Sequence, residues 1–381
     1  MLMKAVKFSP MQGNNVGDVV ISKCIEYLFF RNKVNLISYD LYFRDPDSFV
    51  HKSTVVNEAR TVSVRNKISF FLQNRIPILF YFLKKIIYKV SGDSIKYKNV
   101  IDDSDVVVVG GGNIIMSKMG CDYGFRVSEI LRAAKGKKRV VLSCGVGSFL
   151  YEEKEILNDV YSNCETISVR DENSKKYFSK YNLDVNVIPD PVFILSDLIS
   201  EKINRTARNK VGLNLLPNFF TEDQLDSLVS EVSKLLESYD LELLIINTAY
   251  PQDEMLAQDF QSKLMEFNSN AKVSIVNLDS NVDKIAEVYS ELDIFFGCRM
   301  HSLIFSLALG VPAYGFAWDG KVKGMFHEFY DGEGAEYIVD ENNINIFDIY
   351  KSRDSEKVHQ RLKKMKEKIY NSVSIELNKV L

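Results

Sequence analysis

The chain has 381 residues, and its 48 basic and 51 acidic side chains give a formal net charge of −3. This length suits two α/β domains, and the near-balanced charge gives the protein as a whole no electrostatic reason to bind nucleic acid. The five cysteines are scattered without CxxC or Cys/His spacing, which argues against a disulfide framework or a zinc site. No stretch resembles a signal peptide or a membrane-spanning helix, so we expect a cytoplasmic protein.

Short strand-like runs alternate with helical patterns along the chain, which predicts βα units and mostly parallel sheets. The fold class expected is therefore α/β, with two doubly wound Rossmann-like domains facing a cleft and a C-terminal helix packing back across them. The domains are expected at 1–199 and 211–345, with a helical segment at 346–381. Strands are expected at 5–9, 34–40, 105–111, 139–145, 166–170, 185–190, 211–216, 241–248, 272–278, 292–297 and 311–316.

The first strand leads into MQGNNVGDVV, where small and amide residues precede a helix. Backbone N–H groups in such a turn can approach an anion, which makes Asn14, Asn15 and Asp18 candidate residues of the cleft. The alternative is a tight turn in which Asp18 caps the helix. The turn lacks both GxGxxG and the P-loop lysine, so the sequence leaves both interpretations open.

Residues 60–92 contain seven basic and no acidic side chains, and apolar residues separate the basic ones. This pattern is typical of a basic amphipathic segment at a membrane surface. The alternative is a helical hairpin that packs on the first domain, with Pro77 opening its second helix. The segment thus predicts either peripheral contact with the inner face of the cell membrane or an ordinary packed hairpin.

Glycine-rich loops follow two further strands of the first half. DVVVVGGGNII places Gly111, Gly112 and Asn113 after a fully apolar strand, where glycine permits a close backbone approach to a ligand. SCGVGSF repeats the pattern after the next strand. Two neighbouring strand ends without bulky side chains predict a shared cavity.

Two charged residues follow later strands of the first half. Arg170 ends one strand and is either an anion ligand or the ion-pair partner of Asp171, which with Asn173 is a candidate helix cap. Asp190 lies between two prolines, where it either orients a sugar hydroxyl or makes a rigid turn.

GCRMHS, at 297–302, places Arg299 and His301 between a strand and an apolar helix. Histidine is the side chain best suited to proton transfer near neutral pH, and arginine offers a planar fork to carboxylate or phosphate. The alternative is an ordinary capped junction. The loop after the next strand, AWDGKVKGMF, adds Lys321, so positive charge gathers around a histidine.

In this order, the motifs resemble the polysaccharide pyruvyl transferase family. The matching stretches span residues 14 to about 326, and the RxH block is the most specific of them. They are NNVGDVVI, DVVVVGGGNII, SCGVGS, ISVRDENS, PDPVF, ELDIFFGCRMHSLIFSLALGVPAY and WDGKVKGMF.

The resemblance implies a GT-B-like fold and a transferase that acts in exopolysaccharide biosynthesis for the cell envelope. Such an enzyme moves the enolpyruvyl group of phosphoenolpyruvate onto a sugar as a pyruvate ketal and releases phosphate. The sugar belongs to a polysaccharide or to its lipid- or nucleotide-linked precursor. His301 is then the general acid/base and Arg299 binds phosphoenolpyruvate, with Arg170 and Lys321 as further anion ligands.

No cofactor and no metal are expected beyond phosphoenolpyruvate as the donor substrate. A GT-B-type glycosyltransferase that uses a nucleotide sugar is the main alternative, because the same architecture and a cationic rim would suit a diphosphate. A catalytically silent sugar-binding subunit is a third possibility.

Overall fold

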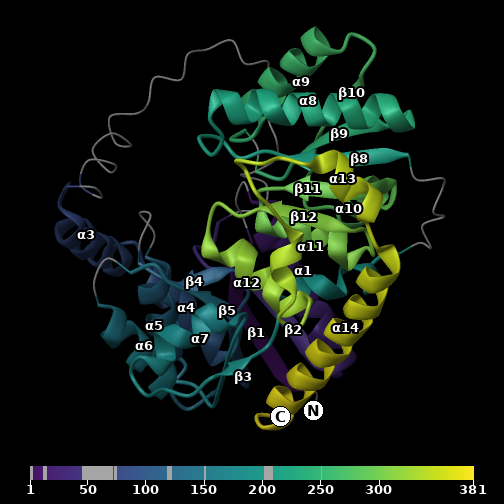
Figure 1. Ribbon diagram of the computed structural model, residues 1–381. Helices are drawn as coiled ribbons and strands as arrows, with labels where there is room; N and C mark the ends of the chain where they lie inside the picture. Colours follow the sequence, from purple (N-terminus) through teal and green to yellow (C-terminus); the bar gives the residue numbers. More distant parts are fainter. Residues whose placement is uncertain are drawn as a thin grey trace. The chain divides into compact units, whose positions relative to one another are not determined.

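The computed structural model describes residues 3–11, 15–44, 72, 75–117, 122–149, 152–200, 209–249 and 251–381. The chain divides into two compact units, each built on its own parallel sheet (Figure 1). The first unit comprises Met1–Gly13, Ile25–Ile188 and Asn371–Leu381, and the second comprises Asn14–Cys24 and Pro189–Tyr370. The domain boundaries expected from the sequence, 1–199, 211–345 and 346–381, stay a prediction.

The sheet of the first unit has the strand order β2-β1-β3-β5-β6-β7, with β4 paired to β5, and all of these pairs are parallel. Every residue of its central strand, VVVVG, is buried, as expected where helices cover both faces of a parallel sheet. The strands are β1 (Lys4–Ser9), β2 (Asn35–Asp40), β3 (Val106–Gly110), β4 (Asn113–Ile115), β5 (Lys138–Val146), β6 (Thr166–Val169) and β7 (Asn186–Val187).

Helices alternate with these strands, as the βα pattern predicts. Pro77 occupies the first turn of α3, where its missing N–H costs no hydrogen bond, as expected from the sequence. The helices are α1 (Val16–Arg31), which begins in the second unit, and α3 (Pro77–Val90), α4 (Asp93–Asp102), α5 (Tyr123–Ala133), α6 (Glu153–Ser162) and α7 (Glu172–Ser179).

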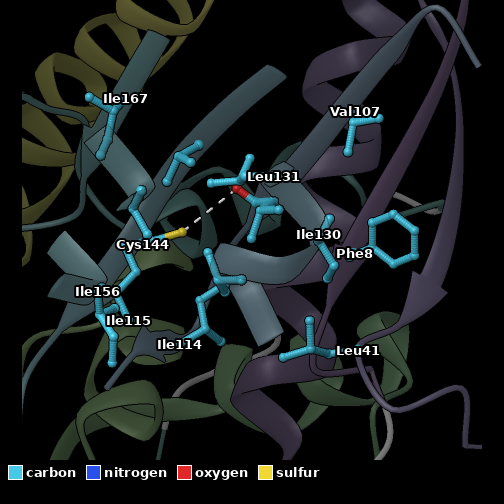
Figure 2. Packing of buried hydrophobic residues seen from close by; sticks show 14 of the residues in the cluster. Phe8, Leu41, Val107, Ile114, Ile115, Ile130, Leu131, Cys144, Ile156 and Ile167 are labelled. Atoms are coloured by element: carbon cyan, nitrogen blue, oxygen red, sulfur yellow. Dashed lines mark hydrogen bonds between the residues drawn. The ribbon is translucent and has the colours of Figure 1, made fainter. Parts of the chain in front are cut away.

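The core of the first unit is an aliphatic cluster between the sheet and these helices (Figure 2). Phe8, Val107, Ile130 and Leu131 are each buried, and each contributes about 1.5–3 kcal/mol by leaving water. Cys144 of β5 lies in the same cluster, with its Sγ 3.7 Å from the carbonyl oxygen of Val109. Burial raises the pKa of this thiol to about 12, so Cys144 behaves here as a small apolar side chain.

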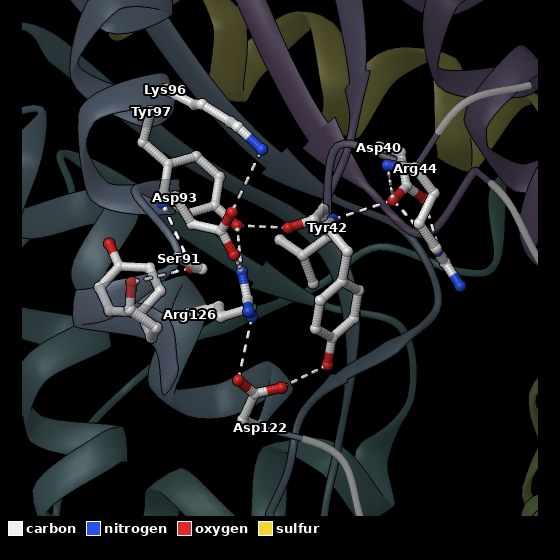
Figure 3. A network of polar contacts seen from close by, with 11 residues as sticks. Asp40, Tyr42, Arg44, Ser91, Asp93, Lys96, Tyr97, Asp122 and Arg126 are labelled. Atoms are coloured by element: carbon white, nitrogen blue, oxygen red, sulfur yellow. Dashed lines mark hydrogen bonds and ion pairs between the residues drawn. The ribbon is translucent and has the colours of Figure 1, made fainter. Parts of the chain in front are cut away.

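A buried polar network joins α4 to α5 (Figure 3). Arg126 donates from Nε to Asp122 Oδ2 at 3.0 Å and from Nη1 to Asp93 Oδ2 at 2.8 Å. Its Nη1 also lies 3.2 Å from the Tyr97 hydroxyl, and the Tyr42 hydroxyl donates to Asp122 at 2.5 Å. Loss of one partner from such a buried pair costs about 3–5 kcal/mol, so the network fixes α4 on its unit.

The sheet of the second unit has the strand order β10-β9-β8-β11-β12-β13, again with parallel pairs. This order places β8 and β11 at its centre and reverses direction there, which is where open α/β sheets bind ligands. The strands are β8 (Lys210–Asn214), β9 (Glu242–Asn247), β10 (Lys272–Asn277), β11 (Leu292–Gly297), β12 (Ala313–Phe316) and β13 (Ile338–Val339).

The helices of the second unit carry clear start signals. A capping box between Thr221 and Gln224 opens α8, and Asn281 caps α10. The elements are α8 (Glu222–Tyr239), α9 (Glu254–Phe267), α10 (Val282–Ser290), α11 (Met300–Ala308), α12 (Gly320–Phe329), α13 (Ile346–Ser352) and α14 (Ser355–Asn378), with 3-10 helices η2 (Pro191–Asp197) and η3 (Gly334–Tyr337).

Each strand expected from the sequence overlaps an observed strand. The strand expected at 185–190 is shorter in the structure, where only Asn186–Val187 form β7. Asp190 and Pro191 instead begin η2. The sequence analysis missed β4 and β13, which are three and two residues long. Within the described part of the chain, no helix combines the length and apolarity that crossing a membrane requires.

Candidate active site

Arg299 and His301 lie where β11 passes into α11, at the carboxyl end of a central strand of the second unit. Arg299 is the N-cap residue of α11, and its side chain makes no capping hydrogen bond. His301 follows in the first helical turn. The terminus of a helix carries a partial positive charge, which favours an anion at this position.

Two buried residues hold Arg299 in place. Its Nη2 donates to Asp253 Oδ1 at 2.5 Å, and the Asp253 side chain is fully buried. Its backbone N–H donates to Asn214 Oδ1 at 3.0 Å, while Asn214 Nδ2 donates to the Ile246 carbonyl at 2.8 Å. The side-chain amide of β8 therefore joins the end of β9 to the start of α11 and fixes the arginine's backbone.

His301 faces a carboxylate. Its Nε2 lies 3.7 Å from Asp190 Oδ2, and the two side chains are only 11% and 6% exposed. Asp190 also caps η2, since its Oδ1 accepts a hydrogen bond from Val192 N at 3.0 Å. Asp190 thus makes the rigid turn and also approaches the histidine, and the sequence had offered only the turn or a sugar contact.

The first turn of α1 packs against His301. A Cβ placed on Gly17 would lie 2.0 Å from His301 Nδ1, so only glycine leaves room for the imidazole. Asn15 Oδ1 accepts from Gly17 N, and Asn15 Nδ2 donates to Asp18 Oδ2, each at 3.1 Å. The alternative in which Asp18 caps this helix is wrong, because α1 begins at Val16 and Asn15 Oδ1 accepts a hydrogen bond from its first turn. Asn14 lies outside the described residues.

Buried polar atoms without a hydrogen-bond partner gather at this site. Among the residues that the structure describes, Arg299 Nε, His301 Nε2 and Asp253 Oδ2 are all in this state. Most buried polar atoms in native proteins have a hydrogen-bond partner, so a group of buried atoms without one calls for an explanation. A bound polar ligand would supply the missing partners.

Lys321 lies on the neighbouring strand-to-helix junction. It is exposed, in the first turn of α12, whose N-cap Asp319 accepts from Lys321 N at 2.9 Å. Trp318 joins the two junctions, because its Nε1 donates to the Cys298 carbonyl at 2.8 Å. The predicted rim of the second unit is thus built from the ends of the paired strands β11 and β12.

Backbone hydrogen bonds to β5 hold the glycine loop that follows β3. Gly111 and Gly112 have φ of 77° and 73°, which disfavours residues with a side chain. Gly111 N donates to the Leu142 carbonyl and Gly145 N to the Gly112 carbonyl. Asn113 Nδ2 donates to the Gly147 carbonyl at 2.9 Å, while its buried Oδ1 has no partner among the described residues.

Arg170 lies at the end of β6 in the first unit. Its Nε is 3.4 Å from Asp171 Oδ2, and Asp171 caps α7 by accepting from Ser174 N at 2.7 Å. A Cβ on Gly145 would lie 2.9 Å from Arg170 Cζ and 2.7 Å from Asn113 Oδ1. The structure therefore brings Gly145, Arg170 and Asn113 together, while the cavity expected between the two glycine loops stays a prediction.

Two contributors to the site escaped the sequence analysis: Asn214 and Asp253. A buried amide in the apolar run VGLNLL was a usable signal for Asn214. No local pattern marks Asp253, because its importance depends on its contact with Arg299. Gly17 lies in the turn that the sequence singled out, but its contact with His301 is visible only in the structure. Across the described ranges, no group of three or more His, Cys, Asp or Glu side chains is arranged to hold a metal ion.

Comparison with known proteins bears on both sequence and fold. A family model described as polysaccharide pyruvyl transferase matches residues 15–320. Among curated proteins, none matches this sequence.

Solved structures resemble the chain over nearly its whole length. The UDP-GlcNAc 2-epimerase of Methanocaldococcus jannaschii is 12% identical, with a TM-score of 0.54 and coverage of 95% of this chain and 92% of that one. HepE of Anabaena in complex with UDP is 8% identical, with a TM-score of 0.51 and coverage of 99% and 98%. At such low identity these likenesses concern the fold alone, and they confirm the expected α/β class with two Rossmann-like sheets.

Proposed function

Because this chain belongs to the polysaccharide pyruvyl transferase family, we propose that it transfers the enolpyruvyl group of phosphoenolpyruvate to a sugar. The product is a pyruvate ketal on a cell-surface polysaccharide or on its lipid- or nucleotide-linked precursor, and phosphate is released. The observation that carries the proposal is the pair Arg299 and His301 at the start of α11, because Arg299 Nε and His301 Nε2 are buried without a hydrogen-bond partner among the described residues.

His301 is proposed as the proton carrier. Ketal formation begins when the vinyl carbon of phosphoenolpyruvate takes a proton, which leaves an oxocarbenium-like centre at the neighbouring carbon. A sugar hydroxyl attacks that centre and loses its proton, which returns to the imidazole. A second hydroxyl then displaces phosphate, and its proton leaves with the phosphate. One histidine can serve the first two transfers in turn.

Asp190 is proposed to act beside His301. Its Oδ2 lies 3.7 Å from His301 Nε2, so a hydroxyl of the acceptor sugar that contacts the imidazole also comes within reach of this carboxylate. We infer that Asp190 helps to orient the acceptor hydroxyl toward His301.

Arg299 is proposed to bind the donor. Phosphoenolpyruvate carries a carboxylate and a phosphate, and fixed cations in a partly dry site hold and neutralise such groups. Asp253 takes one Nη of Arg299 and leaves the rest of the fork for the donor. Lys321 and Arg170 are further anion ligands in the proposal, and Gly111, Gly112, Asn113, Asn14, Asn15 and Asp18 belong to the loops that receive the acceptor.

A nucleotide-sugar glycosyltransferase is the second candidate. Its support is the likeness in fold to HepE of Anabaena, which was solved with UDP.

We further propose that the enzyme is cytoplasmic and peripheral to the inner face of the membrane. It uses no metal and no other cofactor, and it has no nucleic acid partner.

Incubation with each donor separates the candidates. With phosphoenolpyruvate and a panel of glycans, we expect phosphate release matched by an acceptor that gains one pyruvic acid less one water. Dependence of product formation on a nucleotide sugar would support the second candidate and refute the first. Absence of turnover with both donors would instead favour a catalytically silent sugar-binding subunit.

A further inference from the structure

Helix α3 carries an apolar face that the protein leaves exposed. Seven of its apolar side chains are between 37% and 80% exposed: Ile78, Leu79, Phe82, Leu83, Ile86, Ile87 and Val90. Their spacing places them on one half of the helix surface, because residues three to four apart share a face. Soluble proteins rarely expose a continuous apolar patch of this kind unless it binds something.

The opposite face of α3 is attached to the first unit. Phe80 and Tyr88 are buried, and the Tyr88 ring meets that of Phe125 edge-on at 5.2 Å. Lys85 Nζ lies 3.0 Å from Glu152 Oε2. The helix is therefore held on its unit by one side, and the apolar half is not needed for that attachment. Figure 1 shows α3 at the margin of the unit.

The helix that carries this face is basic. Lys84, Lys85 and Lys89 lie on α3, which has no acidic residue. In the sequence, residues 60–92 hold seven basic side chains and no acidic one. The rest of the chain is net acidic, since the whole carries −3. Lysines beside an apolar helix face are typical of segments that bind anionic lipid headgroups.

We propose that α3 docks in the plane of an anionic lipid surface, with Phe82 and its apolar neighbours inserted and the lysines at the headgroups. A helix of 14 residues is about 21 Å long, too short for a hydrocarbon core of about 30 Å, so it lies in the interface. A second copy of the chain fits less well, because a twofold interface through α3 would bring two helices of the same positive charge together. The inference does not depend on the proposed reaction.

Sedimentation of the full chain with vesicles tests the docking. We expect binding to vesicles of phosphatidylglycerol with phosphatidylcholine, weak binding to phosphatidylcholine alone, and a fall in binding at high salt. Phe82→Glu should lower the affinity for the anionic vesicles at least tenfold, because an aromatic side chain that inserts into the lipid is replaced by a charge. Phe267→Glu is the matched control, since Phe267 is also a helical phenylalanine and is 64% exposed against 59% for Phe82.

Charge reversal supplies the second arm. Lys84→Glu with Lys89→Glu should cost about fivefold in affinity per lysine, whereas the exposed Lys363→Glu should leave it unchanged. Equal binding by Phe82→Glu and Phe267→Glu, or no binding by the wild type, would overturn the proposal. So would light scattering that shows Phe82→Glu converting a dimer into a monomer without changing vesicle binding.

Discussion

An arginine follows β11 in the second unit and another follows β6 in the first unit, but the residues around these two arginines differ. Arg299 in the second unit has a histidine two residues away and buried carboxylates beside both side chains. Arg299 Nε and His301 Nε2 have no hydrogen-bond partner in the part of the chain that the structure describes. Arg170 in the first unit lies against Gly145 and Asn113, with Asp171 as its charged neighbour and no histidine nearby in the sequence. This difference supports our proposal that proton transfer takes place in the second unit, and that the first unit contributes backbone groups and the guanidinium of Arg170.

The strongest test of this contrast is the loss of the imidazole. His301→Gln should lower kcat by about 10² to 10⁴, because general acid/base catalysis contributes that much. Binding of phosphoenolpyruvate, measured by calorimetry, should persist because Arg299 stays in place. Arg170→Gln, the matched change in the first unit, should raise KM for phosphoenolpyruvate more than it lowers kcat. The reverse pattern would refute the assignment of roles to the two units.

Two glycines offer a subtler version of the same comparison. Gly17→Ala would place a methyl group 2.0 Å from His301 Nδ1, and displacement of the ring should lower kcat by about 10². Gly145→Ala would place a methyl group 2.9 Å from Arg170 Cζ, and displacement of that guanidinium should mainly raise KM for phosphoenolpyruvate. Gly320→Ala, where a Cβ meets nothing within 4 Å, is the control. An unaltered kcat in Gly17→Ala would show that the imidazole position is not critical.

Asp253 is expected to act through Arg299. Asp253→Asn keeps the shape but removes the charge that orients the guanidinium, so KM for phosphoenolpyruvate should rise about tenfold. Because a positioning role moves KM more than kcat, initial-rate kinetics at saturating acceptor distinguish it from simple damage. Equal falls in kcat and in thermal stability, with KM unchanged, would instead indicate a purely structural residue.

The smallest expected effect is on the pH dependence of stability, and it comes from the buried thiols of Cys144 and Cys298. Burial raises the pKa of Cys144, before Gly145, to about 12, and also raises the pKa of Cys298, before Arg299. An unfolded thiol titrates near 8.5, so the unfolded chain binds fewer protons above that pH and stability falls as pH rises towards 12. Between pH 7.5 and 9.5 the wild type should lose about 1 kcal/mol more than Cys144→Ala, measured by urea unfolding. Equal losses would contradict the buried, protonated thiol.

Much of the fold follows from local sequence. Apolar runs such as VVVVG and their glycine-rich ends identify the strands, since parallel strands buried on both faces are continuously hydrophobic. The short β4 and β13 escaped because two or three residues carry no periodicity. The length of β7 was overestimated, because Pro191 begins a 3-10 helix shortly after it.

The site was predictable only in part. Arg299, His301 and Lys321 follow strands and could be found by reading along the chain. Asp253 could not, because it matters through one contact with a residue far away in the sequence. Gly17 belongs to a turn that the sequence marked, but its contact with His301 could not be predicted. Asp190 was recognised as a candidate, but its approach to His301 depends on how η2 packs on α11.

The most direct test of the central claim, that His301 delivers a proton to the vinyl carbon of phosphoenolpyruvate, is the transfer reaction in deuterated water. Mass spectrometry of the glycan should show one deuterium in the methyl group of each ketal formed by the wild type. His301→Gln should form that product at a rate lower by about 10² or more. A ketal without solvent deuterium, or an equal rate of deuterated product from His301→Gln, would contradict the account.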